Sequence, residues 1–319
     1  MAGTIMRVGP CARRLARVGL KAAGVTLSWS TFLEPMAQGL NRRNFHGRTV
    51  NLRGGVGAAA GSVMASVEAG RLTRGASASA SSAPRSDSWV GLASTLATTA
   101  SGCAGLVDDL DAGAHDGDAP AKGLKGHLTA LAHGRVTTGA LKIAVIGSGA
   151  LVGGVLLACH RSAGTDRRPL AASAVDAASS AVDAASSAVV IASWANLLNL
   201  LDLRPGRALK AASIVSVPLL ATPGRAGEPT RLLAAGTLGV SLTALPGDLQ
   251  ENTMLGDTGA NAVGALLGTA LACHPSRVVR AGAALSGVGL ILASEKVSFS
   301  RVIADTPVLA ALDGLGRRP

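Results

Sequence analysis

Aromatic residues and paired cysteines are scarce in this sequence of 319 residues. It contains three Phe, three Trp and no Tyr. Proteins that bind single-stranded nucleic acid without sequence preference stack bases on aromatic side chains, so no nucleic-acid partner is predicted despite the formal net charge of +11. The four cysteines, Cys11, Cys103, Cys159 and Cys273, lie far apart with no C-x-x-C pair. Neither a disulfide framework nor a zinc site is indicated.

Charged residues are also few. They make up 15% of the chain, against about 25% in an ordinary soluble domain, while 48% of the residues are hydrophobic. Nine apolar stretches bounded by charge lie near 15–39, 54–70, 88–107, 138–159, 187–201, 209–222, 231–246, 258–273 and 279–294. We therefore predict an all-α, polytopic integral membrane protein, a single membrane domain over residues 1–319 with about nine to ten transmembrane helices.

The polar segments between these stretches fall into two alternating sets. The acid-rich and glycine-rich segments are 41–55, 108–138, 202–210, 247–258 and 295–319. If the helix count is right, all five face the same side of the membrane. Lys and Arg are almost equally frequent in the two sets, so the positive-inside rule does not orient the chain.

The stretch "KIAVIGSGALVGG", Lys142 to Gly154, has two interpretations. G-x-G-x-x-x-G after a strand would indicate a dinucleotide-binding enzyme, but that site also needs a second strand and an acid about 20 residues further on. Here the apolar run continues without a break. We therefore predict a membrane helix in which Gly147, Gly149, Gly153 and Gly154 allow close helix packing, and a soluble dehydrogenase is a distant alternative.

One internal repeat is clear. "SAVDAAS" occurs at Ser173–Ser179 and again at Ser180–Ser186, and "SAVVIAS" follows as a diverged third copy over Ser187–Ser193. A spacing of seven residues keeps equivalent positions on one helical face, which is typical of an amphipathic N-terminal extension of the fifth helix. A local duplication that simply lengthens a loop or helix is the favoured interpretation.

Three polar motifs carry candidate chemistry. Asp108 and Asp109 are adjacent carboxylates at the end of an apolar run, which is either a solvated helix end or a costly arrangement that binds a cation or a proton. Asp257 lies between two glycines at a predicted helix start, where it could bind Mg²⁺ or simply cap the helix. The third motif holds Asn196, Asn199 and Asp202 on one face of a helix, followed by a cationic rim of Arg204, Arg207 and Lys210.

Together these motifs resemble the polyprenyl-phosphate N-acetylhexosamine-1-phosphate transferase superfamily. The matching segments occur in the family's order, from about Asn41 to Gly264. They are "NFHGRTVNLRGG", "GLVDDLD" followed by "KGLKGHL", "NLLNLLD" and "GDTGAN".

The resemblance implies a multi-pass enzyme of the plasma membrane with its active face in the cytoplasm, serving cell-envelope polymer synthesis. It would transfer a sugar 1-phosphate from a UDP-sugar to a polyprenyl phosphate and release UMP, with Mg²⁺ or alternatively Mn²⁺. Homodimer formation is left open. The implied roles are catalysis for Asp108 and Asp109, metal binding for Asp257 and Asp109, and substrate binding for Lys122, Lys125, Asn196, Asn199, Asp202, Arg204 and Arg207.

The sequence departs from the family pattern in two places. Leu203 and Pro205 replace a glycine and a second acid after Asp202, and the segment "SEKVSFSRVI" lacks the histidines expected there. These departures leave a second hypothesis open, a catalytically inactive relative that acts as a membrane binding or regulatory partner in envelope assembly.

Overall fold

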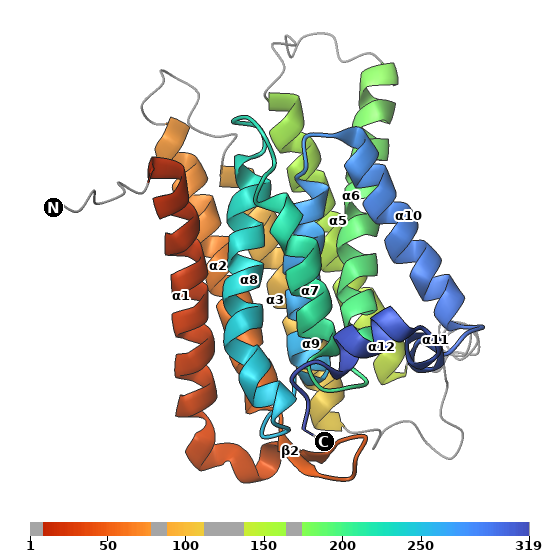
Figure 1. Ribbon diagram of the computed structural model, residues 1–319. Helices are drawn as coiled ribbons and strands as arrows, with labels where there is room; N and C mark the ends of the chain where they lie inside the picture. The colour runs from red at the N-terminus through yellow and green to blue at the C-terminus, as the bar shows by residue number, and fades with distance from the viewer. Residues whose placement is uncertain (1–8, 78–87, 112–136, 164–173, 319) are drawn as a thin grey trace, which may run out of the picture.

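The computed structural model describes residues 9–77, 88–111, 137–163 and 174–318, and these form a bundle of helices with one small hairpin (Figure 1). The long helices are α1 (Pro10–Phe32), α2 (Arg53–Ser77), α3 (Ser88–Asp111), α5 (Thr138–Ala163), α6 (Ala174–Leu201), α7 (Arg207–Leu219), α8 (Glu228–Leu249), α9 (Gly256–Ala272) and α10 (Arg277–Ser294). The 3₁₀ helix η1 (Glu34–Leu40) leads into antiparallel strands β1 (Asn41–Arg43) and β2 (Thr49–Asn51), and the chain closes with α11 (Phe299–Asp305) and α12 (Pro307–Gly314).

Each apolar stretch identified in the sequence lies largely within one long helix, so the all-α prediction is confirmed. Among the described residues, five helical segments are long and apolar enough to cross a membrane: Trp89–Asp111, Thr138–Ala163, Asp176–Leu201, Glu228–Leu249 and Arg277–Ser294. These segments support a membrane protein, but the expected nine to ten spans are not confirmed. Two of the other helices, α7 and α9, have only 13 and 17 residues.

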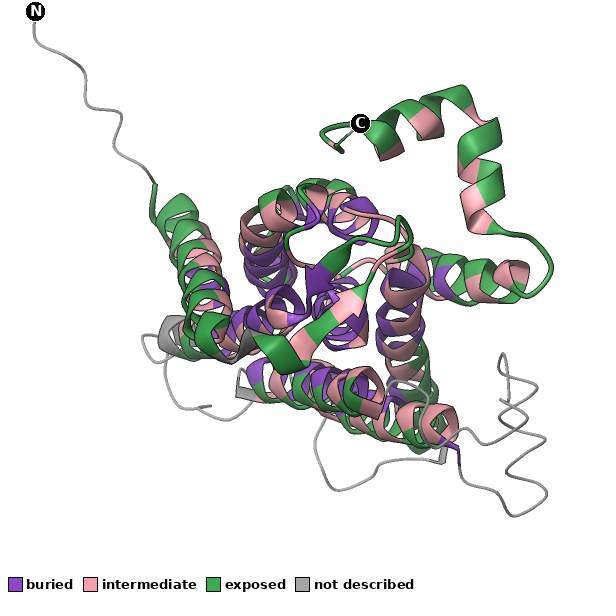
Figure 2. Cartoon of the chain, turned by 90° about the horizontal axis from the view of Figure 1, so that it is seen from below, coloured by how far each residue is buried: buried purple, intermediate pink, exposed green. Residues whose placement is uncertain are grey.

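Helix α9 forms the centre of the bundle. Of its 17 residues only Asp257 is not buried, and α2, α3, α6 and α8 pack around it. Figure 2, a view along the bundle, shows buried residues concentrated on the inner sides of the helices. Small residues permit this packing. A Cβ at Gly264 would lie 2.5 Å from the carbonyl oxygen of Trp194, and one at Gly268 would lie 2.9 Å from Cα of Ile191.

The glycine-rich stretch from Lys142 to Gly154 is helical throughout and belongs to α5. The strand that a dinucleotide cradle requires is therefore not formed there. Glycines 149, 153 and 154 pack closely against α3 and α6, as expected; a Cβ at Gly149, for example, would lie 2.5 Å from Cβ of Ala100. The same expectation was wrong for Gly147, where a Cβ would meet nothing within 4 Å.

The heptapeptide repeat forms most of α6, from its first residue Ala174 to Ser193, which confirms the predicted helical extension. Its second copy supplies Asp183, whose carboxylate accepts a hydrogen bond from Arg161 Nε of α5 at 2.5 Å. The same guanidinium donates to Ser187 Oγ at 2.7 Å and to the carbonyl of Ala272, the last residue of α9, at 3.1 Å. This Arg161 clasp joins α5, α6 and α9 at one end of the bundle.

The acid-rich and glycine-rich segments gather at the opposite end, as far as the structure describes them. The β1–β2 hairpin contacts the turn after α8 there, where Asn51 forms a bridge with Thr253. Buried Glu251, at φ 56°, accepts hydrogen bonds from the Asn44 amide and from Arg48 Nη1 at 3.0 Å, and its carboxylate lies 3.2 Å from His46 Nδ1. Burial alone would raise the pKa of Glu251, but these hydrogen bonds and the neighbouring positive charge lower it below its usual value.

Loss of one seven-residue copy should leave the Arg161 clasp intact. Deleting Asp176–Val182 still leaves an aspartate in register with Arg161, so the free energy of unfolding should change by less than about 0.5 kcal/mol. Asp183→Asn removes the carboxylate partner and should cost about 1–3 kcal/mol. Thermal unfolding in detergent compares the two variants. An equal loss in both would contradict the assigned role of the clasp.

The hairpin should loosen in acid. Because the pKa of Glu251 is lowered in the folded state, its contribution is fully present above its unfolded pKa, near 4.5, and is lost as pH falls through the lower folded value. Hydrogen exchange of β1 and β2 amides, measured from pH 6 down to about 3, should show this loss in the wild type and not in Glu251→Gln. Glu34→Gln, a change at an exposed acid of the same end, should keep the wild-type profile.

Candidate functional site

The site begins where the end of α3 meets the start of α9. Asp109 of α3 accepts hydrogen bonds from the backbone N–H groups of Asp257 at 3.0 Å and Thr258 at 2.9 Å, and from Thr258 Oγ1 at 2.6 Å. A helix N-terminus favours a negative charge, because its first N–H groups have no partner within the helix. Both oxygens of Asp109 are therefore committed to holding α9 in place.

Gly256 makes this contact possible. It has φ 56°, a conformation that L side chains rarely adopt, and a Cβ there would lie 2.9 Å from both carboxylate oxygens of Asp109 and 2.5 Å from Leu52 Cδ2. The first glycine of "GDTGAN" thus lets the Asp109 carboxylate approach the start of α9 closely.

Lys142 of α5 lies at the centre of the site. Its ammonium donates to Asp108 Oδ2 at 3.1 Å and pairs with the Asp257 carboxylate. In the amide orientation that satisfies both of its neighbours, Asn199 of α6 donates to Asp257 Oδ1 at 2.9 Å and accepts from Lys142 Nζ at 2.9 Å. Side chains from α3, α5, α6 and α9 thus converge on one cation, and we refer to Asp108, Lys142, Asn199 and Asp257 as the Lys142 cluster.

Asp202 lies beside this cluster. The Gly256 N–H donates to its carboxylate, but burial raises the pKa of Asp202 well above its usual value, and the carboxylates of Asp248 and Asp257 raise it further. Asp248 in turn accepts from the Gly206 N–H at 2.6 Å. The α6–α7 loop (202–206) is therefore fixed at both ends by carboxylate–backbone hydrogen bonds.

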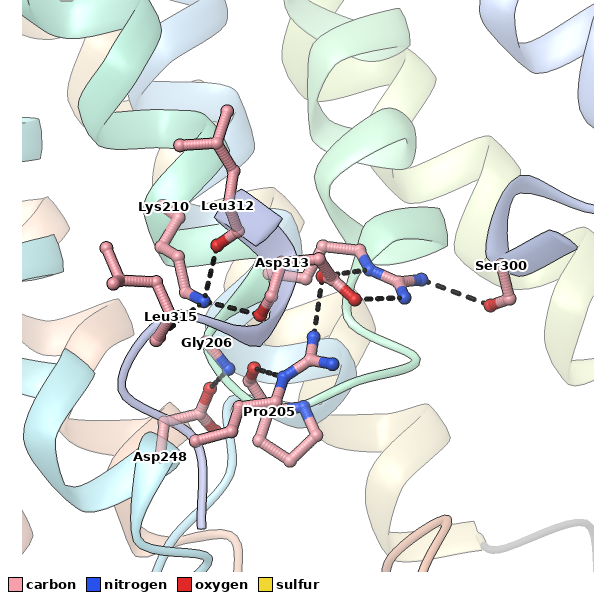
Figure 3. A network of polar contacts seen from close by, with 10 residues as sticks. Pro205, Gly206, Lys210, Asp248, Ser300, Leu312, Asp313 and Leu315 are labelled. Atoms are coloured by element: carbon pink, nitrogen blue, oxygen red, sulfur yellow. Dashed lines mark hydrogen bonds and ion pairs between the residues drawn. The ribbon is translucent and has the colours of Figure 1, made fainter. Parts of the chain in front are cut away.

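The residues of the predicted cationic rim make two kinds of contact. Arg204 stacks on the exposed ring of Phe45 at the hairpin tip, with its guanidinium carbon 3.4 Å from the ring centroid. Arg207 and Lys210 instead bind the C-terminal segment. Buried Arg207 forms a bidentate pair with Asp313 at 2.8 and 2.9 Å, and Lys210 Nζ donates to the backbone carbonyls of Leu312, Asp313 and Leu315 (Figure 3). The positive charges of Arg207 and Lys210 are therefore compensated by groups of the protein itself.

The structure accounts for the other predicted site residues as follows. Asn196 is half-buried on α6, three residues before Asn199 and so about one turn further from the cluster. Lys122 and Lys125 lie outside the described residues. The acids Asp108 and Asp109, Asp202 and Asp257, from three separate parts of the sequence, come together with Asn199.

Sequence reasoning missed Lys142, Thr258 and Asp248. Lys142 had a usable signal, because a lone lysine in an otherwise apolar helix is costly and commonly functional. Thr258 stands within the recognised "GDTGAN" motif, but its hydroxyl contact with Asp109 depends on the packing of α3 against α9. Asp248 lies in a turn-like "LPGD" that gave no indication of its partner Gly206.

Comparison with known protein families found no match to this chain, and comparison with curated proteins found none either. The interpretation of the site therefore depends on its own geometry.

Gly256→Ala should disrupt the junction of α3 and α9. The added methyl group meets the Asp109 carboxylate in a backbone conformation unfavourable for alanine, and we expect a loss of about 1–3 kcal/mol in the free energy of unfolding. Gly147→Ala is the matched control, because it lies within α5 with open space around it and should be neutral or stabilising by about 0.5–1 kcal/mol. Similar melting temperatures for the two variants would contradict the role given to Gly256.

Proposed function

We propose that this protein transfers a sugar 1-phosphate, of the N-acetylhexosamine class, from a UDP-sugar to a polyprenyl phosphate and releases UMP. The observation that carries the proposal is the Lys142 cluster, in which acids, an amide and an ammonium from four helices meet at one end of a bundle of apolar helices. A donor dissolved in water and an acceptor phosphate on a membrane lipid can both reach such a position.

The chain's own residues suit the chemistry of phosphoryl transfer, which needs positioning and charge neutralisation. An oxygen of the lipid phosphate forms a bond to the phosphorus of the sugar 1-phosphate, and the bond from that phosphorus to the UMP oxygen breaks. Asp108 is suited to accept a proton from the lipid phosphate, and Lys142 to neutralise phosphate oxygens. Asp109 is a positioning residue, because both of its oxygens are bound to α9.

The residues also fit the Mg²⁺ that the family resemblance implies. Oxygens of Asp108, Asp257 and Asn199 surround the Lys142 ammonium, and carboxylate and amide oxygens are ligands that Mg²⁺ accepts. Within the described residues no three His, Cys, Asp or Glu side chains form a metal-binding group, so the amide or substrate phosphates would complete the shell. When bound, Mg²⁺ or Mn²⁺ would neutralise the charge of the diphosphate.

A second candidate function is that of an inactive relative that binds lipid phosphate or nucleotide as a partner in envelope assembly. Two observations favour it. Lys142 already neutralises Asp108 and Asp257, and two of the cations expected for substrate, Arg207 and Lys210, hold the C-terminal segment. The two candidates differ in turnover, and both are compatible with binding.

The test is UMP release by the purified full-length protein with Mg²⁺, undecaprenyl phosphate and a panel of UDP-sugars. We expect UMP from at least one donor and a loss of at least about 100-fold in Asp108→Asn and Asp257→Asn. Glu295→Gln, a change at an exposed acid of the same end, should retain turnover.

Nucleotide binding is measured alongside turnover, for example by equilibrium dialysis with the same UDP-sugars. No UMP from any donor, with nucleotide still bound, would reject the enzyme and favour the second candidate. Equal turnover in wild type, Asp108→Asn and Asp257→Asn would show that the chemistry takes place elsewhere.

A further inference from the structure

The C-terminal helices are attached to the bundle through one polar side. Figure 3 shows Lys210 of α7 directed at the end of α12, where Arg207, also of α7, binds Asp313. In addition to the bidentate pair with Asp313, Arg207 Nη1 donates to Ser300 Oγ of α11 at 3.1 Å, and Arg317 donates to the Pro205 carbonyl at 2.9 Å and to Asp313 at 2.6 Å. A buried guanidinium with a bidentate carboxylate partner gives a well-defined geometry. We call residues 299–318 the C-terminal strap.

The side of the strap turned away from this network is apolar. Val308 and Leu312 are four residues apart on one face of α12, and Leu315 directly follows the helix; 70%, 46% and 68% of their surfaces are exposed. On α11, Val302 is 42% exposed, and no residue of either helix is buried. The described part of the protein thus leaves this stripe uncovered.

The apolar stripe lies close to a helix that is long and apolar enough to span the membrane. Helix α11 begins at Phe299, separated by only four residues from the candidate span Arg277–Ser294, so it must lie near the level at which that span leaves the bilayer. The preceding helix α10 is itself largely uncovered, with Leu285 75% and Leu292 58% exposed. Figure 1 shows α11 and α12 near one end of the bundle, running crosswise to α10, and Figure 2 shows that they lie beside the bundle rather than over its end.

We propose that the C-terminal strap lies in the membrane–water interface, with its apolar stripe in the boundary between lipid headgroups and acyl chains. An amphipathic helix in the plane of the interface has this arrangement, one side apolar and the other bound to polar partners. The occupant of the stripe is therefore phospholipid.

This position has a consequence for the α6–α7 loop. Arg317 holds the carbonyl of Pro205, and the next residue, Gly206, donates to Asp248. The strap thus fixes the loop that follows Asp202 at a set depth relative to the lipid surface. The exposure and charge pairing of the strap are the same whether or not the site is catalytic.

The test uses a fluorescent label at a single cysteine in the full-length chain, after replacement of the four native cysteines by alanine. Labels at Leu312→Cys and Val308→Cys, in phosphatidylcholine vesicles, should be quenched by lipids carrying a shallow doxyl group and protected from aqueous iodide. A label at Arg43→Cys, an exposed position on β1, should show the reverse. Iodide quenching at 308 and 312 equal to that at 43 would overturn the proposal, and so would protection that disappears on dilution in lipid, since that indicates a second copy.

Proteolysis provides a readout that needs no label. In vesicles, Val308→Ser with Leu312→Ser should speed tryptic cleavage after Arg301 several-fold, because the strap leaves the interface more often. Ala310→Ser, a change on the same helix away from the stripe, should leave the cleavage rate unchanged. Equal rates in all three proteins would count against the lipid contact.

Discussion

The contact between the Asp109 carboxylate and the first N–H groups of α9 is the constraint on which the site depends. α9 is the central helix of the bundle, and its neighbours approach it closely through glycine. Asp109 fixes where this helix starts along its axis, and the position of Asp257 opposite Lys142 follows from it.

Charge compensation explains how the rest of the acidic end is tolerated beside apolar helices. Lys142 lies between two carboxylates, Asp248 is bound to a backbone N–H, and Glu251 is surrounded by donors from the hairpin. At the opposite end buried Glu68 is paired with Arg17 and Lys21 at 2.5 and 2.8 Å. A buried ion stripped of its partner costs several kcal/mol, so each pairing restricts how its helices can move apart.

Much of the fold could be predicted from the sequence, because apolar runs bounded by charge determine where helices lie. The motif acids were also predictable as a group.

The cations that face these acids could not be predicted. Arg207 and Lys210 look in the sequence like a rim for substrate, but the chain turns back at its C-terminus and brings Asp313 and the end carbonyls of α12 to them. Lys142 shows the converse, since a lysine near the start of an apolar stretch lies among acids from two other helices and an amide from a third once the bundle packs. Such long-range pairings depend on tertiary contacts that local patterns do not record.

The repeat in α6 has a consequence for how the gene can change. Its unit of seven residues is close to two helical turns, so an insertion or deletion of one whole unit keeps the rest of the helix on nearly the same face. A whole copy gained or lost again presents an aspartate to Arg161, so the change alters the length of α6 beyond the bundle without altering the clasp. Related genes could therefore carry different numbers of copies while selection acts on a single aspartate.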